Sequence, residues 1–195
     1  KGSELLSGSK NFYDDLGNEI GSAEFMNGEL DKAHCTSFHF SKSETEVTGE
    51  EDEAQTITTG YEKEINPSSY TEEVDPANFY DQFNDSVLSE TITKTVTDAE
   101  GNNLSQTTTY LRGKNKTETV TTYENDDFGR TVKENTVQKK YQDGRWLPSY
   151  ETEVSYTYDE NGNVTETETK SRKEGETDWQ IQKTKAVSYT HLTLP

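Results

Sequence analysis

Carboxylates are the most abundant groups in this sequence that could perform chemistry. Asp and Glu make up 38 of the 195 residues, so almost any face of the folded chain would carry two of them. Glycosidase chemistry needs one carboxyl that is desolvated enough to stay protonated and act as a general acid. Only 27% of the residues are hydrophobic, which leaves little apolar surface for such a pocket. We therefore predict that the protein is not an enzyme.

Two segments contain metal-ligand residue types, but neither has the spacing of a metal site. His34, Cys35 and His39 lie close together, yet an odd separation places the two histidines on opposite faces of a strand. The segment that begins at Asp159 imitates the start of a calcium-binding loop but lacks the glycine and the glutamate needed at its sixth and twelfth positions. We predict no metal site and no cofactor.

Aromatic side chains are the best candidates for contact with a ligand, because aromatic rings on a sheet can stack on sugar rings. The same rings could instead form the only substantial hydrophobic face of the module, and the sequence leaves both interpretations open. The candidates are Tyr123, Trp146, Tyr150, Tyr156, Tyr158 and Trp179.

The elements that must position these rings are predicted from a repeated turn motif, Asp-x-x-Gly. Asp at the first position can accept hydrogen bonds from backbone amides, and Gly at the fourth takes the positive φ that closes a type I turn. Each copy is predicted to join two strands as a β-hairpin with a glycine bulge. The four copies contain Asp14 and Gly17, Asp98 and Gly101, Asp126 and Gly129, and Asp159 and Gly162.

A longer period runs through the second half of the chain. Tyr123 and Tyr156 are 33 residues apart, as are Trp146 and Trp179. A second class of glycine turn recurs every 31 residues, at Gly113, Gly144 and Gly175. Within this half, the segment 150–158 alternates Tyr, Thr and Val with Glu, Ser and Thr, which predicts a half-buried antiparallel strand. Residues 88–186 are therefore predicted to form β-hairpin repeats of about 31–33 residues.

The predicted fold class is all-β, an antiparallel meander of hairpins in an extended or single-layer sheet. Residues 1–87 are predicted to be less regular, with strands over 38–47 and 56–65 and one short helix that starts near Pro76. Residues 187–195 depart from the polar composition and read as a translated sequencing adapter, so we expect an artefact there and a natural protein that continues beyond Ala186.

Net charge limits the classes of partner. The chain carries 19 basic and 38 acidic residues, a net charge of −19, which argues against nucleic acid and anionic membranes. The sequence has no apolar run long enough to predict membrane insertion. High charge with few apolar residues is also typical of disorder, which stays open as an alternative, although the aromatic residues at fixed offsets from the turns favour order.

At these turns the sequence resembles the YD repeats of bacterial Rhs-type proteins and related cell-surface proteins, whose elements read Tyr-Asp-x-x-Gly followed by Arg or Asn. The complete pattern is present at 13–18 and 158–163, and the Gly-Arg form is present at 129–130. The resemblance covers about half of the chain, two of the four turns lack the Tyr, and the period is longer than that of the family. It implies long sheets built from hairpins, on secreted or surface proteins that bind glycans or neighbouring cells.

We therefore expect a non-catalytic β-repeat module of a secreted or cell-surface bacterial protein, acting as a spacer, an adhesion segment or an interaction surface for a glycan or a surface protein. The alternative is a ligand- or glycan-binding accessory domain of a larger enzyme or toxin, cut at residue 186.

Overall fold

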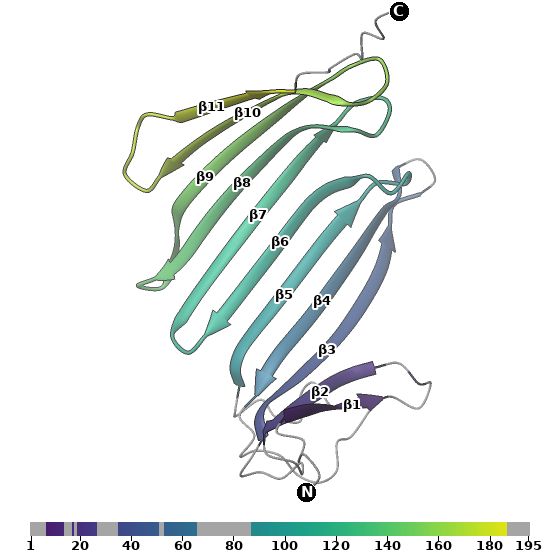
Figure 1. Cartoon of the computed structure of the whole chain (residues 1–195), viewed down its shortest axis with the longest axis vertical. Helices are drawn as coiled ribbons and strands as arrows, with labels where there is room; N and C mark the ends of the chain where they lie inside the picture. The colour runs from purple at the N-terminus through teal and green to yellow at the C-terminus, as the bar shows by residue number, and fades with distance from the viewer. Residues whose placement is uncertain are drawn as a thin grey trace, which may run out of the picture. The chain divides into compact units, whose positions relative to one another are not determined.

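Eleven antiparallel strands follow one another in a single sheet of the computed structural model, in the order of the chain (Figure 1). The structure describes residues 7–13, 17, 19–26, 35–50, 53–65 and 87–186, and these ranges contain no α-helix. The predicted all-β meander is confirmed. The strands are β1 (Ser7–Tyr13), β2 (Glu19–Met26), β3 (Cys35–Thr48), β4 (Gln55–Ile65), β5 (Val87–Thr97), β6 (Asn103–Arg112), β7 (Asn115–Asn125), β8 (Thr131–Gln142), β9 (Arg145–Tyr158), β10 (Val164–Lys173) and β11 (Gln180–Lys185).

Glycine turns of the Asp-x-x-Gly type connect β5 to β6, β7 to β8 and β9 to β10. The glycines Gly101, Gly129 and Gly162 have φ of 87°, 75° and 82°. In each turn the glycine N–H donates to the carbonyl of the first Asp, at 2.9–3.1 Å, which closes a type I turn. Gly17 also has a positive φ, of 84°, whereas Asp14 lies outside the described residues.

The second class of glycine turn is not uniform. Asp143 and Gly144 both have positive φ, 51° and 79°, as a type I′ turn requires. In the turn after β6 the positive φ belongs to Gly113, the first residue between the two strands, which is the type II′ arrangement. The last copy, at Gly175, opens a longer loop in which the Glu176 N–H donates to the Lys173 carbonyl at 3.1 Å. The 31-residue spacing therefore preserves a glycine but not one turn geometry.

Two compact units make up the chain, and each is described by itself. Unit 1 consists of residues 1–47, 57–94 and 108–117, and unit 2 of residues 48–56, 95–107 and 118–195. The fully buried apolar side chains of the described residues, Phe40 and Ile65, both lie in unit 1. Phe12 stacks on Phe40 with ring centroids 6.0 Å apart, and Gly21 leaves no room for a side chain beside the His39 carbonyl.

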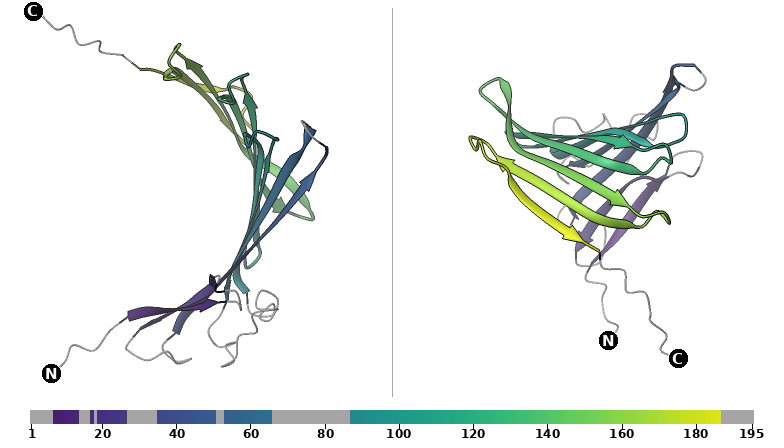
Figure 2. Two further views of the ribbon diagram at one scale, coloured as in Figure 1. Left: turned by 90° about the vertical axis from the view of Figure 1, so that its right-hand side faces the viewer. Right: turned by 90° about the horizontal axis from the view of Figure 1, so that it is seen from above.

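Unit 2 has no fully buried side chain among its described residues. Its strands lie side by side, and no other described element of unit 2 covers either face of the sheet that they form (Figure 2). The segment predicted to be half-buried, 150–158, accordingly has partly exposed residues on both faces. The predicted helix near Pro76 and the residues 187–195 lie outside the described residues. The division at residue 87 stays a prediction.

Candidate functional site

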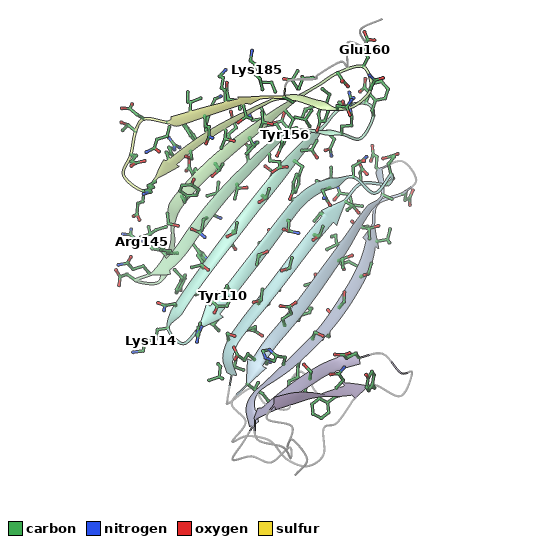
Figure 3. All side chains as sticks on the ribbon, in the orientation of Figure 1. Tyr110, Lys114, Arg145, Tyr156, Glu160 and Lys185 are labelled. Carbon is green, nitrogen blue, oxygen red and sulfur yellow. The ribbon has the colours of Figure 1, made fainter. Side chains whose placement is uncertain are left out.

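Strand β9 gives unit 2 two chemically different faces, because alternate side chains of a strand point to opposite sides of its sheet. We call one the tyrosine face, defined on β9 by Tyr150, Thr152, Val154, Tyr156 and Tyr158. We call the other the charged face, defined by Glu151, Glu153, Ser155 and Thr157 of β9 and their neighbours Lys133, Glu166, Glu168, Lys170, Arg172, Lys183 and Lys185 on β8, β10 and β11. Figure 3 shows the side chains along these strands, with Tyr156 and Lys185 labelled.

Three predicted aromatic residues, Tyr123 of β7 and Tyr156 and Tyr158 of β9, gather on the tyrosine face, and we call them the tyrosine cluster. Glu134 of β8 reaches this cluster, where its Oε1 accepts a hydrogen bond of 3.1 Å from the Tyr156 hydroxyl. Partial burial, followed by the charge of Glu134, raises the pKa of both Tyr123 and Tyr156. The Tyr158 hydroxyl donates to the Thr131 carbonyl at 2.6 Å. The hydroxyls of Tyr156 and Tyr158 are therefore both held by hydrogen bonds to β8.

The turn between β7 and β8 extends this cluster. The Arg130 guanidinium bonds to the Asp126 carboxylate, with Nη2 at 2.6 Å and Nε at 2.8 Å from Oδ2. The same guanidinium lies 4.7 Å from the ring centre of Tyr158 and 5.0 Å from that of Phe128. The Asp126 Oδ1 accepts from the Phe128 amide at 3.0 Å, which holds the backbone of the turn that carries the Phe128 ring, and this ring is 82% exposed.

Each described Asp-x-x-Gly turn is closed by the residue that follows its glycine. Asn102 and Asn163 play the part of Arg130, and their side-chain amides donate to Asp98 and Asp159 at 2.9 and 3.0 Å. Their backbone amides donate to the same carboxylates at 2.7 and 2.8 Å. These bonds, led by the side-chain bond from the residue after the glycine, lower the pKa of all three aspartates. This role was not predicted, although the Asn or Arg that follows each glycine is visible in the sequence.

Two neighbouring turns of unit 2 border a hollow of about 740 Å³. Tyr123 and Phe128 contribute aromatic rings to its lining, and Asp98, Glu100 and Asp127 contribute carboxylates. The turns contact each other directly, since the Asn125 side chain donates to the Asn103 carbonyl at 2.8 Å. Rings beside carboxylates are suited to a sugar, whose faces stack on rings and whose hydroxyls donate to carboxylates.

The other predicted aromatic residues do not join the tyrosine cluster: Tyr150 lies on the tyrosine face toward the opposite end of β9, and Trp146 and Trp179 lie elsewhere. In the pairing of β8 with β9, Gln138 faces Tyr150 and Lys139 faces Pro148, so β9 contains one extra residue. The bulge moves Trp146 to the charged face, where it packs edge-on against Tyr141 with centroids 5.3 Å apart. Trp179 instead lies 4.6 Å from the Arg172 guanidinium. Of the six aromatic residues predicted to contact a ligand, three thus form the tyrosine cluster and the other three lie apart from it.

The charged face is held by ion pairs between strands. Glu153 of β9 lies between Lys133 of β8 and Lys170 of β10, with both nitrogen-to-oxygen distances 2.9 Å. Hydrogen bonds from Lys170 and Lys133, in that order, lower the pKa of Glu153. The charged side chains of this face are therefore mostly paired with one another, and these pairs hold neighbouring strands together.

Within the described residues, no group of three or more His, Cys, Asp or Glu side chains is arranged to hold a metal ion. His34 lies outside those residues. The described part of the chain also contains no helix that is long and apolar enough to cross a membrane.

Comparison with known proteins finds no relative of this chain. No protein-family model matches the chain, and neither the curated proteins nor the solved structures contain a match. The resemblance to YD repeats therefore stays a prediction.

Proposed function

We propose that this chain is a non-catalytic β-repeat module of a secreted or cell-surface bacterial protein and acts through the surface of its sheet. The observation that carries the proposal is the tyrosine cluster, which lies on an open sheet face beside the exposed Phe128 rather than inside an enclosed pocket. Rigid aromatic rings provide contact area at low cost in conformational entropy, and they are common anchors of binding surfaces.

The state of the carboxylates supports a binding role over a catalytic one. A general acid at neutral pH needs a raised pKa, which requires a desolvated carboxyl. Among the described residues, the carboxyls with a clear shift are Asp98, Asp126, Asp159, Glu153 and Glu168, and each pKa is lowered. Each of these groups is held as a charged acceptor by its neighbours.

A second candidate function is a glycan-binding accessory domain of a larger enzyme or toxin. The hollow between the Asp98 and Asp126 turns favours it, because this hollow combines the Tyr123 and Phe128 rings with carboxylate acceptors. The first proposal needs only an exposed surface, whereas this one needs a saturable sugar site at that hollow.

A glycan array and a panel of bacterial and host cell surfaces test both candidates with the same variants. Phe128→Ala removes the exposed ring, and Tyr110→Ala removes a partly exposed ring of unit 1 as the matched control. We expect the wild-type chain and Tyr110→Ala to bind a surface component, and Phe128→Ala to bind it about tenfold more weakly, as for an interface anchor. Saturable binding of a free oligosaccharide with the same loss supports the second candidate. A wild-type chain that binds no component rejects both binding roles and leaves only a spacer.

A further inference from the structure

The turn between β9 and β10 carries a pair of residues that is prone to a spontaneous backbone reaction. Asn161 precedes Gly162, and within the described residues no other Asn is followed by Gly. Glycine has no side chain to keep its backbone nitrogen away from the preceding Asn. The corresponding position is Glu100 in the turn after β5 and Phe128 in the turn after β7, so the reaction is specific to this turn. Figure 3 labels Glu160, the residue next to Asn161.

The reaction replaces the side-chain amide of Asn by a carboxyl. The Gly162 nitrogen loses its proton to water or hydroxide and forms a bond to the Asn161 Cγ. The bond from Cγ to the side-chain nitrogen breaks, and that nitrogen takes up a proton and leaves as ammonia. Water then opens the resulting cyclic imide at either of its carbonyls. The products are aspartate and isoaspartate, and in isoaspartate the main chain runs through the side-chain carbonyl.

The closed turn opposes this reaction in two ways. The Gly162 N–H donates to the Asp159 carbonyl at 3.1 Å, so the attacking nitrogen is engaged in a hydrogen bond. A type I turn also holds its third residue at a ψ of about 0°, which aligns the next nitrogen with the residue's own nitrogen. Closure of the imide ring instead needs that nitrogen aligned with the Asn161 Cβ. Asn161 therefore reacts only when the turn opens.

The Asp159 carboxylate controls how often the turn opens. Its Oδ1 accepts from the backbone amides of Asn161 and Asn163 at 2.9 and 2.8 Å, and its Oδ2 accepts from the Asn163 side chain at 3.0 Å. Asp159 thus holds the residues on both sides of Gly162. Local opening breaks the bonds that close a turn, so removal of this carboxylate raises the open fraction.

We propose that Asn161 is a site of spontaneous deamidation whose rate is set by the Asp159 carboxylate. Aspartate at position 161 adds a negative charge beside Asp159 and Glu160, in a chain whose net charge is already −19. Isoaspartate lengthens the main chain of the turn and so disturbs the bond from Gly162 to Asp159. Both products weaken the hairpin of β9 and β10 at the end that carries Tyr158. The inference is independent of any binding role of the tyrosine cluster.

Peptide mapping of the full chain during incubation at neutral pH and physiological temperature measures the reaction. The tryptic peptide from Trp146 to Lys170 contains both Asn161 and Asn163. Asn163 is the internal control, because Val164 follows it and its side-chain amide is bound to Asp159. Chromatography separates the two products, and fragmentation assigns them to a residue.

We expect a mixture of aspartate and isoaspartate at Asn161 and none at Asn163. The rate at Asn161 should be about tenfold higher in guanidinium chloride than in buffer, because the denatured chain has no turn to open. Absence of isoaspartate at Asn161, or equal rates in buffer and denaturant, overturns the proposal.

Matched variants test the control by Asp159. Asp159→Ala removes the carboxylate of this turn, and Asp98→Ala removes the equivalent carboxylate of the turn between β5 and β6. In buffer, Asp159→Ala should deamidate at Asn161 about tenfold faster than the wild type, whereas Asp98→Ala should keep the wild-type rate. Asp159→Asn retains an acceptor oxygen and should fall between Asp159→Ala and the wild type.

In denaturant all four chains should react alike, which separates an effect of the folded turn from an effect of the lost charge. A wild-type rate in Asp159→Ala, or an equal acceleration in Asp98→Ala, contradicts control by Asp159.

Discussion

The first residue of each Asp-x-x-Gly turn is a charged acceptor that holds its loop closed. Because the pKa of Asp98, Asp126 and Asp159 is lowered from 3.8 by folding, their contribution to stability is complete above that value and is lost as pH falls through the folded pKa. Asp159→Asn keeps an acceptor oxygen but no longer titrates.

We expect the urea midpoint of the wild type to decrease more steeply below pH 4 than that of Asp159→Asn. Protonation of other acids also relieves repulsion, so the difference between the two proteins is the measured quantity. Glu160→Gln removes a carboxyl from the exposed middle of the same turn and should follow the wild type. Parallel curves for wild type and Asp159→Asn would show that the Asp159 bonds contribute nothing to folding.

The glycines of these turns differ in what surrounds them. Gly101 and Gly129 both have positive φ, but a Cβ on Gly101 meets no atom within 4 Å. A Cβ on Gly129 would lie 2.5 Å from the Asn102 Oδ1 of the neighbouring turn, and Asn102 is held there by Asp98.

Replacement of each glycine by alanine, measured by chemical denaturation, separates the cost of a positive φ from the cost of the contact with Asn102. Gly101→Ala should lower the free energy of unfolding by about 1–2 kcal/mol, the cost of a left-handed residue with a side chain. Gly129→Ala should lose about 1 kcal/mol more from the contact with Asn102. Asn102→Ser alone also loses the bond to Asp98, so it is the reference for the double variant: in the Asn102→Ser background, Gly129→Ala should cost only about as much as Gly101→Ala does in the wild type. Equal losses in the two single variants would mean that adjacent turns do not pack against each other in solution.

Among the elements, strands β8, β9 and β10 depend on carboxylates shared between strands. Glu153 is 24% exposed and contacts two lysines at 2.9 Å, whereas Glu124 is 64% exposed and lies 4.0 Å from one of them, Lys133. Partial burial and close contact strengthen an ion pair, and exposure weakens it.

We expect Glu153→Gln to lower the free energy of unfolding by about 1 kcal/mol and Glu124→Gln to change it by less than about 0.5 kcal/mol. The measurement is urea unfolding at low and high salt. Added salt should narrow the gap between the variants, because it screens the pairs that Glu153 makes. A Glu124→Gln loss as large as that of Glu153→Gln would contradict the ladder described for the charged face.

The strands and turns were predictable because Asp, Gly, Thr and Val are local signals of reversal and extension. That Tyr123 and Tyr156 lie on the same face of the sheet agrees with the 33-residue repeat, because equivalent positions of successive repeats recur on one face. The role of Glu134 does not follow, because it reaches the cluster from the strand between them. The face of Trp146 could not be predicted either, because it depends on one extra residue in β9 and each such residue inverts the alternation.

At the scale of the whole molecule, composition accounts for the single layer that the described strands of unit 2 form. A packed second layer requires a continuous apolar face, and hydrophobic residues are only 27% of the chain. The buried side chains among the described residues, Phe40, Ile65 and Lys63, are confined to unit 1. Cross-strand pairs and backbone hydrogen bonds must then supply most of the stability of unit 2.

Screening of ion pairs by salt would lower the thermal stability of this chain, but we expect added salt to raise it. The net charge of −19 repels itself over many strands, whereas the ion pairs are local contacts. The Debye length falls from about 30 Å at 0.01 M to about 8 Å at 0.15 M, which removes repulsion across several strands spaced by about 4.8 Å but preserves contacts within one spacing. We expect the melting temperature to rise by a few degrees over this range.

A variant with fewer acids shows whether repulsion is the cause. Glu100→Gln, Glu160→Gln and Glu174→Gln together remove three charges from exposed turn positions. The triple variant should melt higher than the wild type at 0.01 M salt and should gain less from added salt, because less repulsion is left to screen. If the melting temperature of the wild type instead falls with salt, the cross-strand ion pairs outweigh the net charge. The charged face would then be the main source of stability in unit 2.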